Sequence, residues 1–192
     1  IKGSGTITAL YAEQYAMPEL YGGTYGTLEK QNSDGTGVLG FCAEGYGLKG
    51  TNGWVTSYLT DLATDVTVKK APFEIKNIIV TTDPNGTEDS AVLYTGQKVY
   101  IKATVALEDG EEAISTSNPI ECSVAIAPAN GIGTPPSSYE SQYSAEVAAE
   151  RTLSNASGDY KIHFSVLHLG CLVTDTSKKI TVSVCSHNSY TN

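Results

Sequence analysis

The chain has 192 residues, of which 40% are hydrophobic, and a formal net charge of −9 at pH 7. This length allows one or two domains with a packed core, and the acidic balance argues against a nucleic-acid-binding protein. The longest apolar runs are only a few residues, far short of the roughly 20 residues that a membrane-spanning helix needs.

The first part of the chain is rich in glycine, because 12 of the 19 glycines fall in residues 1–53. Each glycine allows a turn at little cost, so this part is expected to contain short strands separated by turns. The segment 3–11 alternates like an extended strand, and further strands are expected at 54–59 and 66–68. These strands are too few to close a sandwich of their own.

A domain boundary is expected near residue 71, where Ala71-Pro72 separates two apolar runs. The rest of the chain, 72–192, has the pattern of consecutive strands typical of an all-β sandwich. Its clearest strand is 99–107, in which every second side chain is apolar. The segment 143–153 contains helix formers but also alternates, so a strand is favoured over a helical turn. Further strands are expected at 73–82, 120–126, 159–166 and 179–184, and on the second of these Glu121 and Ser123 are expected to face outward.

Part of this second region is similar to a known class of domain. Gly158-Asp159-Tyr160 opens an apolar strand that leads through a hairpin into 179–184, and 97–105 suits an earlier strand. On these residues, the segment 72–186 resembles the immunoglobulin-like modules of bacterial and archaeal surface proteins. The resemblance implies an immunoglobulin-like β-sandwich, to which residues 1–71 add a β-rich, glycine-rich segment. The chain departs from antibody-type domains because its single tryptophan, Trp54, lies outside this region.

Cysteine usage favours an oxidising compartment. Zinc sites and thioredoxin-like sites need closely spaced cysteines, whereas the four cysteines here are far apart and include no CxxC pair. Two structural disulfides are therefore expected, with all three pairings open, and buried free thiols are the alternative. The disulfide candidates are Cys42, Cys122, Cys171 and Cys185.

The start of the chain and its sequons also suggest secretion. The sequence begins at Ile1 without a methionine or a signal segment, which fits an extracellular or cell-surface protein whose leader has been removed. Two sequons lie in turn-like surroundings and make Asn85 and Asn155 candidate glycosylation sites.

No signature of catalysis is present in the sequence. It lacks a nucleophile elbow, a P-loop, a dinucleotide fingerprint and a zinc-protease motif. His163 and His168 are five residues apart, so on one strand they should lie on opposite faces and not share a metal. Both are expected to face solvent or to lie in turns. The segment 83–89 has oxygen ligands at alternate positions but lacks the full calcium-loop pattern, which favours an acidic turn. We expect no enzyme activity, no cofactor and no metal site, with calcium left open.

Two classes of function remain. The first is an extracellular structural subunit that assembles with identical copies into a pilus-like filament or surface layer, through β-strand donation and sheet-edge pairing. Residues 1–11 would be the donated strand, with contacts from Ile1, Ile7, Ala9, Leu10 and Tyr11. The alternative is an adhesin-type module that binds carbohydrate or a partner through the loop 128–141 and the N-terminal tyrosines Tyr11, Tyr15, Tyr21 and Tyr25.

Overall fold

The computed structural model describes residues 1–13, 16, 18–31, 37–131 and 138–185, and these residues are all-β apart from one short 3-10 helix. The chain divides into two compact units. The first consists of residues 1–74, 107–111 and 166–174, and the second of 75–106, 112–165 and 175–192. The first stretch of the first unit thus ends close to the boundary expected at residue 71, but two later segments also belong to this unit.

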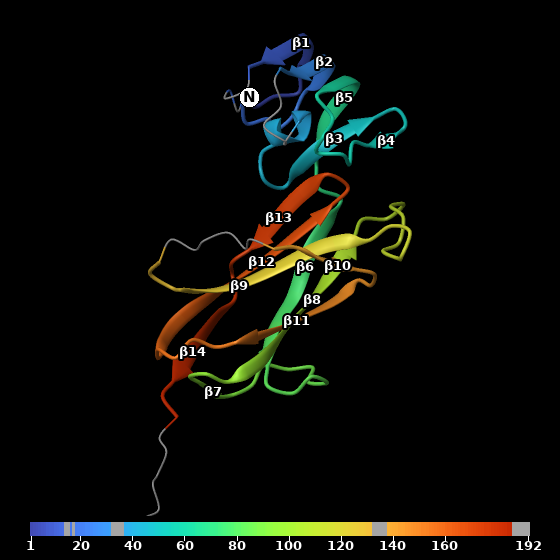
Figure 1. The fold of residues 1–192 in the computed structure, drawn as a ribbon. Coiled ribbons are helices and arrows are strands. Elements are labelled where there is room, and N and C mark those ends of the chain that lie inside the picture. Colours follow the sequence, from blue (N-terminus) through green and yellow to red (C-terminus); the bar gives the residue numbers. More distant parts are fainter. Residues whose placement is uncertain (14–15, 17, 32–36, 132–137, 186–192) are drawn as a thin grey trace, which may run out of the picture. The chain divides into compact units, whose positions relative to one another are not determined.

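The first unit contains a five-stranded sheet in the order β1-β2-β5-β3-β4 (Figure 1). The 3-10 helix η1 (Val38–Phe41) contributes three buried side chains to the core beside this sheet. The core also includes Tyr25, Leu28 and Leu48, all with no exposed surface. The strands are β1 (Thr6–Ala12), β2 (Thr24–Lys30), β3 (Tyr46–Gly50), β4 (Gly53–Trp54) and β5 (Leu62–Lys70).

Two of these strands were missed in the sequence because their glycines were taken as turns. Gly26 lies within β2, where a Cβ atom would be only 2.7 Å from the carbonyl oxygen of Thr8 on β1. Gly47 lies within β3, where a Cβ atom would overlap the sulfur of Cys171. Both glycines therefore permit a close approach of another segment and do not end a strand.

The expected strand at 54–59 is largely wrong, because β4 ends at Trp54 and a turn follows. The strand expected at 3–11 is confirmed as β1, and the one expected at 66–68 is part of β5. β1 pairs with β2 in parallel, from Thr6 opposite Thr24 to Ala12 opposite Lys30. A parallel pair cannot be joined by a tight turn, so the chain between the two strands must cross over.

The second unit holds most of two further sheets, one in the order β11-β8-β6 and one in the order β10-β9-β12-β14-β7, with β13 also paired to β12 (Figure 1). β7 runs parallel to β14, and β9 and β10 are antiparallel. The strands are β6 (Phe73–Thr81), β7 (Leu93–Tyr94), β8 (Lys98–Leu107), β9 (Ile120–Pro128), β10 (Glu140–Gln142), β11 (Glu146–Thr152), β12 (Gly158–His168), β13 (Cys171–Asp175) and β14 (Lys179–Ser183).

The alternation read from the sequence is confirmed for most of these strands. Val99, Ile101, Ala103 and Val105 form a buried row on β8, and the segment at 143–153 is a strand, β11, and not a helical turn. β9 differs from the expectation, because Ser123 was expected to face outward but is buried and donates its hydroxyl to the Ser138 carbonyl. This hydrogen bond satisfies the hydroxyl that burial removes from water.

Among the described residues, no helix has the length and apolar character needed to cross a membrane.

Candidate functional site

β1 is the outermost strand of its sheet, and it is only partly buried. Ile7, Ala9 and Leu10 are half-buried, whereas Tyr11 is 60% exposed. Ile7 and Leu10 pack against the core of the same unit. The segment expected to be donated to a neighbour therefore lies in its own subunit here, with Ile1 half exposed at its start.

The outward edge of β1 has no strand beside it among the strands that the structure describes. Residues Thr6–Ala12 contain no charged residue and no proline, the features that usually prevent a free edge from pairing with another chain. The register on β2 is the same along the whole strand, with paired residues on both sides of Thr8. The edge is thus seven residues long and uncharged.

The other strands at sheet ends are short, charged or covered. β4 and β7 have two residues each and β10 has three. β11 carries three charged residues, Glu146, Glu150 and Arg151. β6 is covered by the segment after it, because Val80 donates its amide to Asp89 Oδ1 at 2.7 Å and accepts the Ser90 amide at 2.9 Å. β13 pairs only with β12 among the described strands, but it ends in the charged Asp175, and its Leu172 carbonyl accepts the Gly45 amide at 2.7 Å. Among the described sheet ends, β1 is the one without such protection.

The N-terminal tyrosines do not form one surface. Tyr25 is fully buried, and Tyr21 packs edge-on against Tyr46 with 5.6 Å between the ring centroids. The Tyr21 hydroxyl donates to Glu19 Oε2 at 2.8 Å, and this hydrogen bond raises the pKa of Tyr21. Tyr11 remains exposed on β1, and Tyr15 lies outside the described residues. Because Tyr25 is buried, the four N-terminal tyrosines do not all belong to one exposed surface for a sugar or a partner.

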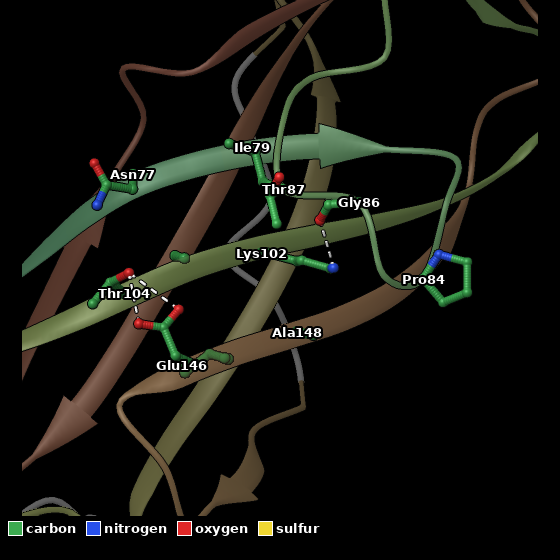
Figure 2. Close-up of a pocket in the computed structure, with 11 residues that line it drawn as sticks. Asn77, Ile79, Pro84, Gly86, Thr87, Lys102, Thr104, Glu146 and Ala148 are labelled. Atoms are coloured by element: carbon green, nitrogen blue, oxygen red, sulfur yellow. Dashed lines mark hydrogen bonds between the residues drawn. The ribbon is translucent and has the colours of Figure 1, made fainter.

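A groove of about 640 Å³ lies on the β6-β8-β11 sheet, next to the turn after β6 (Figure 2). Glu146 on β11 accepts the Thr104 hydroxyl at 3.1 Å, and Lys102 on β8 donates to the Gly86 carbonyl at 2.7 Å. The sequence did not indicate this groove, because its walls come from three strands and a turn that are distant in the chain. Its lining is Asn77, Ile79, Pro84, Gly86, Thr87, Lys102, Ala103, Thr104, Glu146, Val147 and Ala148.

The acidic segment 83–89 is a hydrogen-bonded turn. Asp83 Oδ1 accepts the Asn85 amide at 2.8 Å, and Asp89 accepts both the Val80 amide and the ammonium group of Lys178. The carboxylates thus hold the turn together by accepting hydrogen bonds from neighbouring groups. Across the described ranges, no group of three or more potential metal ligands is found.

A second, shallower groove of about 500 Å³ lies in the first unit beside Trp54. The Trp54 indole nitrogen donates to Glu111 Oε2 at 3.3 Å, and Lys49 Nζ lies 5.0 Å from the centre of the indole ring. The groove combines this aromatic ring with many hydroxyl groups. Its lining is Gly50, Thr51, Asn52, Gly53, Trp54, Val55, Thr56, Ser57, Thr60, Leu62, Ala63, Thr64, Asp65 and Val66.

All four cysteines are free thiols in this structure, so the expected disulfides are not formed in it. Cys122 and Cys171 are buried, Cys42 is half-buried, and Cys185 is exposed. Burial raises the pKa of Cys42, Cys122 and Cys171 to about 12 each. For Cys171, the nearby charges of Cys42 and Glu111 add to this effect.

The remaining candidates are the two sequon asparagines, two histidines of β12 and the loop 128–141. Asn85 and Asn155 are both exposed, as glycan attachment would require. His163 and His168 lie on opposite faces of β12, as expected from their spacing. His168 is buried, with its ring 5.8 Å from that of Phe73, and so it is not the solvent-facing residue that was expected. Of the loop 128–141, residues 132–137 lie outside the described part of the chain.

The chain matches no protein-family model and no curated protein.

Proposed function

We propose that this protein is an extracellular structural subunit that assembles with identical copies, with β1 as the strand that joins one subunit to the next. The observation that carries the proposal is the edge of β1. β1 is seven residues long, uncharged and half-buried. Its inner edge pairs with β2, and none of the other described strands lies beside its outer edge. An exposed edge of this kind is a template for pairing with a second chain.

Two modes of assembly use the same strand. In edge pairing, β1 stays on β2 and a second copy adds a strand to its outer edge. In strand donation, β1 leaves β2 and takes the same place on the β2 of a neighbour. Donation exposes little core, because Ala12 is the only residue of β1 that is buried and the others are half-buried or exposed. The half-buried Ile7, Ala9 and Leu10 would make equivalent contacts in the neighbour.

The way in which the strands of the second unit divide between two sheets supports the interpretation of this unit as a surface module. β6, β8 and β11 lie in one sheet, and β9, β12 and β14 lie in another. If these strands are taken in chain order, this is the division of strands A, B and E from strands C, F and G in immunoglobulin-type sandwiches. We therefore propose an immunoglobulin-like sandwich for this unit, in keeping with the resemblance seen in the sequence.

Deletion of residues 1–11 and the substitution Thr8→Lys test the proposal. Thr8 is exposed on β1, and a lysine there would place a charge on the edge that a second chain must approach. The full chain should form polymers in light scattering and negative-stain images. Deletion of residues 1–11 should abolish the polymers in either mode of assembly, and Thr8→Lys should abolish them in edge pairing. Thr8→Ser is the matched control and should assemble like the parent chain. Polymers that survive both changes, or a full chain that stays monomeric, would contradict the proposal.

The groove beside Trp54 favours a second candidate function, an adhesin-type module that binds carbohydrate. An aromatic ring surrounded by hydroxyl and amide groups suits a sugar, which has both apolar C–H faces and hydroxyls. Trp54 is the only tryptophan, so its fluorescence reports directly on this groove. A shift on titration with a panel of oligosaccharides, with binding lost in Trp54→Ala, would favour this function. An unchanged spectrum with every sugar would argue against it.

A further inference from the structure

Cys42 and Cys171 are far apart in the sequence, but the fold brings their neighbours together in the first unit. Leu39 precedes Cys42 by three residues, and its side chain would lie 3.2 Å from a Cβ atom on Gly170. Gly45 follows Cys42 by three residues, and its amide donates to the Leu172 carbonyl at 2.7 Å. Residues on both sides of Cys42 therefore contact the residues on both sides of Cys171.

The side chain of Cys171 is held in this place. Its sulfur lies against Gly47, where any larger residue would overlap it. Cys171 has no exposed surface, and Cys42 lies close enough that a negative charge on its sulfur would raise the pKa of the Cys171 thiol. We propose that Cys42 and Cys171 form a disulfide, which would join the segment after η1 to the first residue of β13. This proposal does not depend on the proposed assembly through β1.

The other two cysteines cannot form a second disulfide within the chain. The Ala129 amide donates to the Asp159 carbonyl at 2.8 Å, and Gly158 lies opposite Val182. Cys185 therefore lies beyond this end of β12, while Cys122 is about seven residues away along β9. At about 3.3 Å per residue the two are separated by roughly 20 Å, whereas a disulfide needs Cα atoms within about 7 Å.

With Cys42 and Cys171 paired, Cys122 and Cys185 remain as free thiols. The two disulfides expected from the sequence therefore reduce to one.

The cross-link should form during folding and not after it. Disulfide exchange requires a thiolate, and burial in the folded protein keeps both thiols protonated at neutral pH. In the unfolded chain the thiols are accessible to a low-molecular-weight disulfide such as oxidised glutathione. Two protein thiols and one oxidised glutathione then give one protein disulfide and two reduced glutathiones. The glutathione S–S bond breaks, the Cys42–Cys171 bond forms, and both thiol protons end on glutathione.

Mass spectrometry tests this proposal on the full chain. The protein is reduced, refolded with oxidised and reduced glutathione, then denatured and treated with N-ethylmaleimide without further reductant. We expect a linked peptide pair that contains Cys42 and Cys171, together with maleimide on Cys122 and Cys185. Four labelled cysteines, or Cys171 linked to any other cysteine of the same chain, would overturn the proposal.

Three single variants provide the controls. Cys42→Ala and Cys171→Ala should each lose the linked peptide, whereas Cys185→Ala should retain it. Oxidised parent protein should melt at a higher temperature than reduced parent protein, and this difference should disappear in Cys42→Ala but persist in Cys185→Ala. A difference of the same size in oxidised and reduced Cys42→Ala would show that another bond is responsible. Comparison of the parent protein in its two redox states requires no variant, so the test holds even if a variant fails to fold.

Discussion

Gly26 allows β1 to lie close to β2 because it has no side chain. A Cβ atom there would approach the Thr8 carbonyl to 2.7 Å, which is closer than carbon and oxygen atoms pack. β1 and β2 must therefore move apart if this glycine is replaced. The neighbouring pairs, Ile7 with Tyr25 and Ala9 with Thr27, hold the strand on either side of this position.

We predict that Gly26→Ala loosens β1. Forcing one carbon atom into a packed site typically costs about 1–3 kcal/mol, and here the strand at the sheet edge can yield most easily. Hydrogen exchange in a peptide covering 1–12 should become faster, with exchange in β8 unchanged. Gly5→Ala is the matched control, because a Cβ atom on Gly5 would meet nothing within 4 Å. Equal exchange in the two variants would contradict the role given to Gly26.

A second residue, Leu169, adopts a backbone conformation that leucine rarely takes. Leu169 and Gly170 form the two-residue turn between β12 and β13, with φ of 52° and 72°. A hairpin turn with both φ values positive favours asparagine followed by glycine. Asparagine tolerates this conformation much better than residues without a short polar side chain.

We predict that Leu169→Asn is more stable than Leu169→Ala by about 1 kcal/mol. Both substitutions remove the leucine side chain, so their difference isolates the backbone conformation. The midpoint of urea unfolding gives this difference directly. Equal midpoints, or a lower one for the asparagine variant, would show that the turn does not favour asparagine.

At the scale of the element, β1 and β6 are both long strands at a sheet end, and they differ in how the free edge is treated. The turn after β6 returns along the strand, and Asp89 and Ser90 form hydrogen bonds with Val80. Asp89 also contacts Lys178 and so ties this turn to the segment before β14. β1 has no equivalent cover among the described residues, which is why we assign assembly to β1 and not to β6.

We predict that Asp89→Ala uncovers β6 and lowers the free energy of unfolding by about 1–3 kcal/mol, because the Val80 amide loses its acceptor. Asp89→Asn keeps an oxygen for that amide but loses the charge that faces Lys178, so it should lose less stability. Denaturant unfolding of the three proteins measures the order. If Asp89→Asn lowers stability as much as Asp89→Ala, the loss comes from the ion pair with Lys178 and not from the Val80 hydrogen bond.

Elements with regular alternation could be predicted from the sequence, and those that depend on distant partners could not. β8 and β12 were predicted closely because alternate apolar side chains fill one buried face. β2 and β3 were missed because Gly26 and Gly47 make room for Thr8 and Cys171, which only the fold brings near. β7 and β10 are too short to leave a pattern.

The candidate site could likewise be predicted in part, where it depends on local sequence and not on distant partners. The sequence predicted a strand-like, uncharged segment at 3–11, and the structure places it as β1. It could not predict that β1 pairs in parallel with β2, since that pairing depends on a crossover and on Gly26. The groove on the β6-β8-β11 sheet was missed because distant segments line it. The groove beside Trp54 was missed because a strand was wrongly expected at 54–59, where the structure has a turn.

At the scale of the whole molecule, the proposed function assigns separate tasks to the two units. The first unit contains β1 and its uncharged edge, together with Cys42 and Cys171. The second unit contains the sheets for which we propose an immunoglobulin-like sandwich, and both exposed sequon asparagines, Asn85 and Asn155. Assembly would then join subunits through the first unit, while the second unit displays the exposed turns.

A cross-link between strands tests the central claim, which is that β1 joins one subunit to the next. Ala9 and Thr27 lie opposite each other in the β1–β2 register, so cysteines at these positions can meet across the pair. We would mix chains carrying Ala9→Cys with tagged chains carrying Thr27→Cys, in a Cys185→Ala background, and oxidise them.

The mixture and a double variant together separate the two modes of assembly. If β1 is donated, Ala9→Cys chains in the mixture become linked to tagged Thr27→Cys chains, because β1 of one chain lies on β2 of the other. If β1 pairs at its edge, the double variant Ala9→Cys with Thr27→Cys closes within single chains while polymers still form and are lost with Thr8→Lys. Closure within single chains that remain monomeric at every concentration would contradict the account.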